Sequence, residues 1–562
     1  MTGHPAEREP VPVVIVGAGP VGVSAAILLA QHGVDALVVE RWDDIYPLPR
    51  AVHLDDEVYR VLADLGVAEE FARITMPTLG LRLIDDKRRT MAEFERSDPL
   101  GPHGYPPANM FDQPDLERIL RDRLATFTGT TLSAGTELVD IQRDPADSDL
   151  LRVRLRTLAT GEEYAVVTRA VLGCDGANST VRGCIGAMLE DLGFEERWIV
   201  ADVRSDEALP IWQGVHQLCH PRRAGTLMQV GPGRYRWEFQ LLDGETPEQL
   251  LAGGALAELI QPWLGRVRFE DLELIKHAEY TFKARIADRW RDGRVFLLGD
   301  AAHLTPPFIG QGLCAGLRDA ANLGWKLAAV LTGRAGETLL DSYEPERRPH
   351  ARALVKKAVT VGWAMTGGQD KAAHVRRLAL ALATRIPGTT DAVLDTNPPR
   401  FPDTVAVRRS GRRDRVTGGQ VPQPFVRLNG ARVRLDAVTG SGHSVLVTAE
   451  PDPALVSAAG EAGAALVRVV PVAGTPTGPT AYPVVVDEDG HLLEWLRRTR
   501  TTAVLLRPDH VVQARQAAGG ERRGAGRGAG QGVGRDLASY LRSWTRQLSW
   551  GEMRPVGSGG DR

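Results

Sequence analysis

A glycine-rich turn between an apolar strand and an apolar helix constrains this chain more than any other feature. VPVVIVG (11–17) has the pattern of a buried strand, and VGVSAAILLAQHG (21–33) that of a buried helix. Gly17 permits a sharp turn, Gly19 lets a pyrophosphate approach the backbone, and Gly22 lets the helix pack closely on the strand. The complete motif is Gly17, Ala18, Gly19, Pro20, Val21 and Gly22. This context predicts a dinucleotide-binding unit.

An acidic residue supports that prediction. Glu40 closes the next apolar segment, DALVVE (35–40), at about the distance expected for a carboxylate that binds a ribose 2′-hydroxyl. Arg41 follows it and is included among the candidate cofactor-binding residues. The simpler interpretation is a glycine turn that only joins a core strand to a core helix. The motif alone does not distinguish NAD from FAD.

The composition excludes several classes of protein. The 562 residues carry a formal net charge of −3 with both signs interleaved, so no nucleic-acid partner is expected. The uncharged segment 11–34 could resemble a membrane span, but GAGP in its middle would break a transmembrane helix. The four cysteines lie far apart with no CxxC, so we expect no metal site or disulfide and a cytoplasmic location.

The pattern along the chain predicts an α/β protein with an inserted sheet. Strands and helices alternate in residues 1–189, alternating polar and apolar residues in 190–290 predict antiparallel strands, and the α/β pattern returns in 291–386. A Pro-rich linker (387–403) precedes a further domain (404–562), which contains a Gly/Arg segment at 518–535 that we expect to be a flexible loop.

Two further motifs follow predicted strands. In CDGANSTVR (174–182), Asp175 and Gly176 end a strand; the simplest interpretation is a turn with an Asx cap. GDAAHLTPPFIGQGL (299–313) joins a strand to a helix N-terminus, where backbone N–H groups can meet negative charge. Its candidate binding residues are Gly299, Asp300, Pro306, Pro307, Gly310, Gln311, Gly312 and Leu313.

In this order and spacing, the three motifs resemble those of the single-component (class A) FAD-dependent aromatic hydroxylases, the family of para-hydroxybenzoate and phenol hydroxylases. Segments 40–62 and 103–124 resemble the branch that contains 3-(3-hydroxyphenyl)propionate hydroxylase. The resemblance covers residues 11–385. It implies a Rossmann-like FAD-binding domain of the GR2 type and an inserted substrate-binding sheet. From the linker onward a weaker resemblance implies a thioredoxin-like C-terminal domain, here without CxxC.

The resemblance assigns roles by position. Gly17, Gly19 and Gly22 would hold the FAD pyrophosphate, and Glu40 the adenosine ribose. Asp300 would bind the ribityl chain. The other assignments are Arg50 near the flavin and its phosphates, Gln113 in contact with the cofactor, Asp175 and Gly176 linked to FAD and pyridine-nucleotide binding, the amides of Gly310 to Leu313 facing the isoalloxazine, and Pro306 and Pro307 orienting the substrate.

Each assignment has a simpler alternative. Arg50 could form only a surface ion pair, and Gln113 could be a helix N-terminal cap. We interpret His303 as a structural hydrogen-bonding residue and Cys314 as a packing residue. Trp237 and Trp325 are interpreted as core or sheet-face aromatics.

The resemblance implies a monooxygenase that uses FAD, NADH or NADPH, and O₂ to hydroxylate a phenolic substrate through a flavin C4a-hydroperoxide. The expected substrate is 3-(3-hydroxyphenyl)propionate or a related hydroxy-aromatic acid, whose carboxylate could meet Arg234, Arg236 or His216. A homodimer is possible in such a scheme. Two alternatives stay open: a tailoring hydroxylase of polyketide or antibiotic biosynthesis, and a flavin-binding interaction protein without turnover.

Overall fold

The computed structural model describes most of the chain. Within the described residues, no helix is long and apolar enough to cross a membrane. The described residues are 10–46, 51–96, 98–220, 222–252, 254–366, 399–411, 414–475, 478, 480–518 and 535–549.

The first sheet contains the predicted parallel strands. Its central strand β1 (Val11–Val16) pairs in parallel with β2 (Ala36–Val39) on one side and with β11 (Glu163–Gly173) on the other. The last four residues of β1 are buried, as expected for a strand covered on both faces. The order is β17-β18-β11-β1-β2-β8, with β9 and β10 attached through β11. The remaining strands are β8 (Thr131–Ser133), β9 (Thr136–Arg143), β10 (Leu151–Thr157), β17 (Arg291–Asp292) and β18 (Val295–Leu297).

Two helices that open at glycine-rich turns pack against each other beside this sheet. They are α1 (Pro20–Gln31) and α8 (Gly312–Leu331). A Cβ atom on Gly324 of α8 would lie 3.0 Å from the Leu28 Cβ of α1, so glycine allows the close approach. The other elements of this domain are α2 (Asp56–Asp64), α3 (Ala68–Ile74), α4 (Gln113–Leu124), α5 (Thr180–Cys184) and a small sheet of β3 (His53–Leu54), β7 (Asn109–Met110) and β4 (Met76–Pro77).

The second sheet contains the antiparallel strands predicted within 190–290, and it extends beyond them. Its order is β19-β16-β12-β15-β14-β13-β5-β6. Three strands come from outside 190–290 and extend the inserted sheet at its two edges, where two of them pair with backbone groups of β13 and β16. These are β5 (Gly80–Ile84), β6 (Thr90–Glu95) and β19 (His303–Leu304). The others are β12 (Leu189–Arg204), β13 (Val215–Leu218), β14 (Gly225–Gly231), β15 (Arg234–Gln240) and β16 (Glu273–Ala287).

The C-terminal region forms a separate seven-stranded sheet with helices. The three strands β22, β23 and β24 are parallel to one another. Strand β25 pairs antiparallel with β22, and β26 pairs antiparallel with β25. The order is β21-β20-β24-β23-β22-β25-β26. The elements are β20 (Phe425–Leu428), β21 (Ala431–Arg434), α12 (Asp436–Thr439), β22 (Ser444–Val447), α13 (Pro453–Glu461), β23 (Ala465–Val470), β24 (Val484–Val486), α14 (His491–Arg498), β25 (Thr501–Leu506), β26 (Val512–Ala517) and α15 (Arg535–Ser549).

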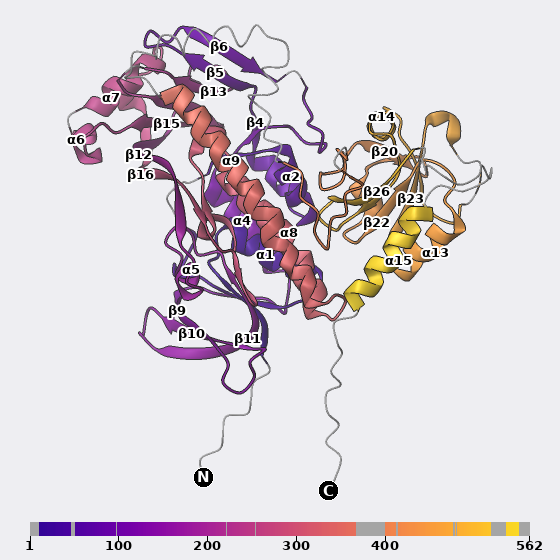
Figure 1. The fold of residues 1–562 in the computed structure, drawn as a ribbon. Helices are drawn as coiled ribbons and strands as arrows, with labels where there is room; N and C mark the ends of the chain where they lie inside the picture. The colour runs from indigo at the N-terminus through magenta and orange to yellow at the C-terminus, as the bar shows by residue number, and fades with distance from the viewer. Residues whose placement is uncertain are drawn as a thin grey trace, which may run out of the picture.

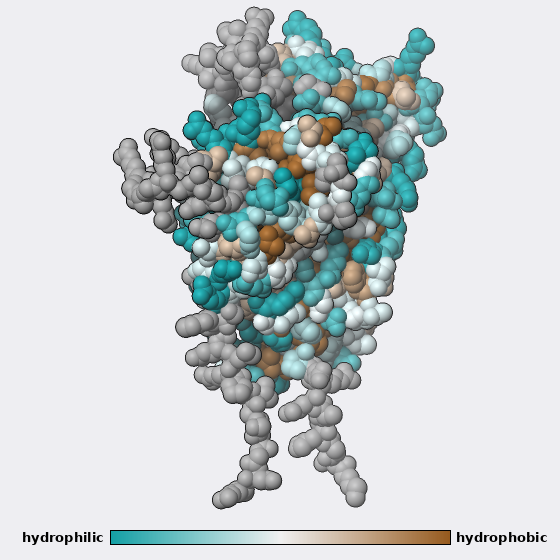
Figure 2. All heavy atoms as spheres, turned by 90° about the vertical axis from the view of Figure 1, so that its right-hand side faces the viewer, coloured by the Kyte–Doolittle hydropathy of each residue, from teal (hydrophilic) through white to brown (hydrophobic). Residues whose placement is uncertain are grey.

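Helix α9 (Tyr343–Thr366) runs diagonally past the nucleotide-binding domain toward the inserted sheet, while the C-terminal domain lies to one side (Figure 1). Seen from that side, hydrophilic and hydrophobic residues are mixed over the surface, and the hydrophobic ones form separate groups (Figure 2). Most of the predicted linker and nearly all of the Gly/Arg segment lie outside the described residues.

Candidate active site

The turn after β1 has the steric properties that the sequence predicts. Gly17 has a φ of +101°, and a Cβ atom there would lie 2.4 Å from the Cys174 carbonyl oxygen. A Cβ atom on Gly22 would lie 2.0 Å from the Gly17 carbonyl oxygen, whereas one on Gly19 would meet no atom within 4 Å. Gly17 and Gly22 therefore pack against the protein, and Gly19 leaves open space. Pro20 begins α1, whose first turn carries no acidic residue, so its positive end suits an anion.

Glu40 lies over this turn. One of its carboxylate oxygens accepts a hydrogen bond from the Ala18 N–H at 2.7 Å, and the other accepts one from the Trp42 N–H at 3.0 Å. A carboxylate offers about four lone-pair positions, so it retains capacity for hydroxyl donors. The neighbouring Arg41 is exposed, and its guanidinium carbon lies 5.6 Å from the centre of the Trp42 ring. Arg50 lies outside the described residues.

Gln113 connects two segments rather than capping a helix. It is the first residue of α4, while Asp112 occupies the N-cap position. The Gln113 Oε1 accepts from the Ala51 N–H at 2.7 Å, and its Nε2 donates to Glu117 at 2.7 Å. Arg121, two turns further along α4, donates to the Ala18 carbonyl at 3.5 Å. Sequence reasoning did not identify Arg121, although its spacing from Gln113 places both on one helix face.

The hydrogen bonds of Asp175 agree with the simpler interpretation, in which it caps a turn. Its carboxylate accepts from the Ser179 hydroxyl at 2.5 Å and from the Thr180 and Val181 N–H groups at 2.7 and 3.1 Å, at the start of α5. Burial raises the pKa of Asp175, and these hydrogen bonds partly oppose that increase. Gly176 has a φ of +77° and open space at its Cβ position.

The loop after β18 meets the first glycine turn. A Cβ atom on Gly316 of α8 would lie 2.6 Å from the Val21 side chain and 3.1 Å from the Gly299 Cα. The two motifs are thus brought into direct contact, and the exposed Asp300 lies next to that contact. His303 is fully buried and bonds Asp319 at 2.8 Å, and Asp319 also bonds Arg347 at 2.8 Å. This supports the structural interpretation of His303.

The loop that precedes α8 presents backbone amides. Pro306 is buried and Pro307 begins a short 3₁₀ turn that ends at Gly310, whose φ is +62°. Helix α8 follows with Gln311 as N-cap residue and no acidic residue in its first turn. The Oε1 of Gln311 accepts from Arg318 at 2.9 Å. The segment through Gly312 and Leu313 therefore forms a helix N-terminus that favours negative charge.

Two residues beside this loop have unusual surroundings. The His53 Nδ1 lies 3.3 Å from the Gly310 carbonyl oxygen, and burial together with the Arg96 charge lowers the pKa of His53. Sequence reasoning did not identify His53, which lies in segment 40–62 but outside the three cofactor-binding motifs. The Cys314 thiol is fully buried, and burial raises its pKa, which supports its interpretation as a packing residue.

The sequence candidates for a substrate carboxylate already have protein partners. Arg236 is buried and forms a two-point ion pair with Asp202 at 2.7 and 3.0 Å, so its charge is already matched within the protein. Arg234 pairs with Asp112 at 2.7 Å. His216 lies 3.2 Å from the Trp212 carbonyl oxygen. Trp237 and Trp325 are buried core residues, as interpreted.

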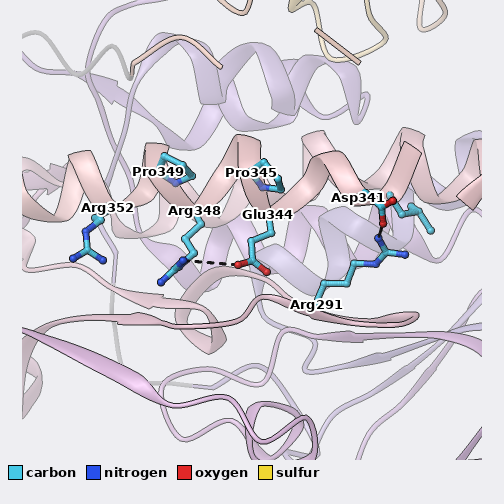
Figure 3. Close-up of a pocket in the computed structure, with 8 residues that line it drawn as sticks. Arg291, Asp341, Glu344, Pro345, Arg348, Pro349 and Arg352 are labelled. Carbon is cyan, nitrogen blue, oxygen red and sulfur yellow. Dashed lines mark hydrogen bonds and ion pairs between the residues drawn. The ribbon is translucent and has the colours of Figure 1, made fainter. Parts of the chain in front are cut away.

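A surface pocket of about 490 Å³ lies along the first half of α9 (Figure 3). Its arginines are engaged by the protein: Arg291 by Asp341, Arg348 by the Ala287 carbonyl, and Arg352 by Glu190. None of the predicted cofactor-binding residues lines this pocket.

The residues of the two contacting turns suit FAD. The open position at Gly19 and the positive end of α1 match a pyrophosphate, and Glu40 and Asp300 can accept hydrogen bonds from hydroxyl groups. The start of α8 matches the electron-rich edge of a flavin. The donor and acceptor types therefore agree with the cofactor that the motifs predict.

Comparison with known proteins agrees with this geometry. The family described as "FAD binding domain" matches residues 10–358, and the "HcaD C-terminal domain" matches residues 418–525. A 3-(3-hydroxy-phenyl)propionate/3-hydroxycinnamic acid hydroxylase of Burkholderia cenocepacia is 34% identical over 91% of this chain and 95% of its own. A probable NADH-specific resorcinol 4-hydroxylase of Rhodococcus jostii is 32% identical over 91% and 94%.

A solved structure also matches nearly the whole chain. The complex of aklavinone-11 hydroxylase with FAD and aklavinone is 27% identical, with a TM-score of 0.74, over 97% of this chain and 99% of the other. These matches do not support the alternative of a flavin-binding protein without turnover. The chain belongs to the family of FAD-binding monooxygenases that hydroxylate aromatic compounds.

Proposed function

We propose that this enzyme hydroxylates a phenolic aromatic acid, such as 3-(3-hydroxyphenyl)propionate or a related hydroxy-aromatic acid, with NADH or NADPH and O₂ as co-substrates. The observation that carries this proposal is the direct contact between the two turns, at Val21, Gly299 and Gly316, within a chain that is 34% identical to a hydroxylase of such acids. That contact would place both ends of one extended cofactor along a continuous surface.

At one end of this surface, the chain would bind the adenosine diphosphate part. The start of α1 would hold the pyrophosphate, and Gly19 would provide the space for it. Glu40 would accept a hydrogen bond from the ribose. Asp175 would act indirectly, because it fixes the start of α5, and Arg182 of that helix donates to the Ala301 carbonyl at 3.0 Å.

At the other end, Asp300 would accept hydrogen bonds from the ribityl chain, and the start of α8 would stabilise negative charge on the reduced ring. FAD, when bound, supplies the redox chemistry with reduced nicotinamide and O₂. His53, whose pKa is lowered, is neutral at physiological pH and can orient a polar group through its second ring nitrogen. Carbonyls at Pro306 and Pro307 would orient the phenol.

The C-terminal domain would support this catalytic part. We infer a thioredoxin-like arrangement from the unit β22–α13–β23, followed by the hairpin β25–β26 and helix α15, with the sheet order β23-β22-β25-β26. The region contains no cysteine, so thiol exchange is chemically excluded there. The domain limits at 189, 290 and 403 are part of the same proposal.

The test is consumption of NADH and NADPH by the FAD-loaded enzyme with a panel of phenols, combined with mass analysis of the products. We expect a hydroxy-aromatic acid to stimulate consumption at least tenfold and to yield a product that is heavier by one oxygen atom. Stimulation by none of the phenolic acids would contradict the proposed substrate class.

A tailoring role on a polycyclic substrate is the second candidate. It is favoured by the likeness to aklavinone-11 hydroxylase over nearly the whole chain. Turnover of a polycyclic phenol with no turnover of phenylpropionates would support it over the first proposal.

A further inference from the structure

Arg96 differs from the buried arginines of the described residues. Arg60, Arg236, Arg318, Arg347 and Arg507 each pair with a carboxylate at 2.6 to 3.0 Å. Arg96 is half-buried, its Nε is shut off from solvent, and within the described chain its side chain has no hydrogen bond or ion pair. Removing an unpaired positive charge from water costs free energy, and a bound anion would offset that cost.

Hydrogen bonds link the segment of Arg96 to the loop that precedes α8. Arg96 follows β6, and its N–H donates to the Leu79 carbonyl at 2.9 Å. The neighbouring Thr78 N–H donates to the Ala108 carbonyl at 3.0 Å, directly before β7, and β7 pairs with β3. His53 in β3 contacts Gly310, and the Arg96 charge contributes to the lowered pKa of His53. The guanidinium therefore lies in the layer that adjoins the start of α8.

The acidic residues near Arg96 do not neutralise it. Asp55 is held by Arg318 at 2.6 Å, and Asp56 accepts from the His103 N–H at 3.0 Å. Burial and the charge of Asp55 raise the pKa of Asp56 to about 7, so this group carries little negative charge below neutral pH. Arg96 thus retains positive charge for a ligand.

A buried apolar cluster lies in the same layer. It connects the residue before β3 and strand β7 with strands β13 and β14 of the inserted sheet. Its members are Val52, Met110, Val215, Met228 and Val230.

We propose that Arg96 binds the carboxylate of the substrate's side chain. The inference rests on the proposed function and makes it more specific. A guanidinium can bind a carboxylate through two parallel hydrogen bonds, whereas a neutral diphenol offers it no charge. Arg96 would therefore select hydroxy-aromatic acids over uncharged phenols.

The test compares 3-(3-hydroxyphenyl)propionate with its uncharged amide in the FAD-loaded enzyme. Dissociation constants come from the change in flavin absorbance, and kcat/KM from product formation. We expect wild type to prefer the acid at least tenfold. Arg96→Met should weaken acid binding by roughly 30- to 100-fold and amide binding by less than about twofold, with partial recovery in Arg96→Lys.

Arg82→Met is the matched control. Arg82 lies on the adjacent strand β5 and already pairs with Glu93 at 2.8 Å, so its loss should leave the preference for the acid unchanged. FAD content and thermal stability of each variant show whether it is folded. If Arg96→Met does not fold, the binding of acid and amide is compared between Arg96→Lys and wild type, which still tests the role of Arg96.

The outcomes separate the inference from the proposed function. Equal wild-type affinity for acid and amide, or an equal loss of both in Arg96→Met, would overturn the role of Arg96 while hydroxylation stands. Hydroxylation of neither compound would contradict the proposed function itself.

Discussion

The glycine turn at 17–22 and the junction between the C-terminal domain and helices α8 and α9 are built in opposite ways. The turn depends on missing side chains within six consecutive residues, where single Cβ atoms would collide with the backbone. The junction depends on polar and charged side chains from segments up to 187 residues apart. The first arrangement follows from local sterics, and the second exists only after the chain has folded.

The junction is a buried cluster of charges around Glu346. Its carboxylate accepts from Lys326 at 2.7 Å, from Asn322 at 2.8 Å, and from Arg507 of the C-terminal domain at 3.0 Å. Burial raises the pKa of Glu346, but its cationic neighbours outweigh that effect and lower it to about 2. The C-terminal domain is therefore held to the catalytic part by fully buried ion pairs.

The largest expected effect concerns the turn. Gly22→Ala places a methyl group 2.0 Å from the Gly17 carbonyl, so we expect it to lower the free energy of unfolding by more than about 4 kcal/mol. Gly19→Ala is the matched change into open space. It should leave stability within about 1 kcal/mol and weaken FAD binding roughly tenfold or more. Urea unfolding and fluorescence titration with FAD measure the two quantities.

Equal destabilisation by both changes would contradict the division of roles between these glycines. Unchanged FAD affinity in Gly19→Ala would show that the pyrophosphate does not use the space at that position.

A somewhat smaller effect is expected at the junction. Glu346→Gln leaves the buried Lys326 without its charged partner, so it should lower the free energy of unfolding by about 3–5 kcal/mol. The exposed pair of Arg427 and Glu488 is the control, and Arg427→Ala should cost less than about 1 kcal/mol. Denaturant unfolding of the full chain measures both. Similar losses would mean that the buried cluster does not stabilise the junction.

The smallest effect depends on pH. Because the pKa of Asp56 rises from its usual value near 3.9 to about 7, the folded state keeps a proton that the unfolded state releases between those values. The free energy of unfolding should therefore fall as the pH rises from about 4 to about 7. Above about pH 7, Asp56 should cause no further change in it. Asp56→Asn removes the effect and should stabilise the protein by about 2–4 kcal/mol at pH 8.

The measurement is urea unfolding of wild type and Asp56→Asn at several values between pH 5 and pH 8.5. The gain from the substitution should grow up to about pH 7 and then level off. A gain that does not vary with pH would show that Asp56 ionises normally in the folded protein.

Much of the fold could be predicted because its strands are continuous apolar runs. β1, β2 and the last four residues of β11 are mostly buried, and β1 and β11 are each followed by a turn that leads into a helix. The inserted sheet was predicted only within 190–290, since β5, β6 and β19 join it by pairing that local pattern does not specify. Among the candidate carboxylate ligands, Arg236 pairs with Asp202 of another strand, a partner that the local pattern does not specify.

The sequence by itself determined the two glycine-rich turns and their attached strands and helices, because backbone sterics act between near neighbours. Only the tertiary structure decided which charges are neutralised. Arg236, Arg318 and Arg507 find carboxylates across the fold, whereas Arg96 does not. The physical reason is that a buried charge is stabilised by whatever lies within a few ångströms in space, and chain order does not encode that distance.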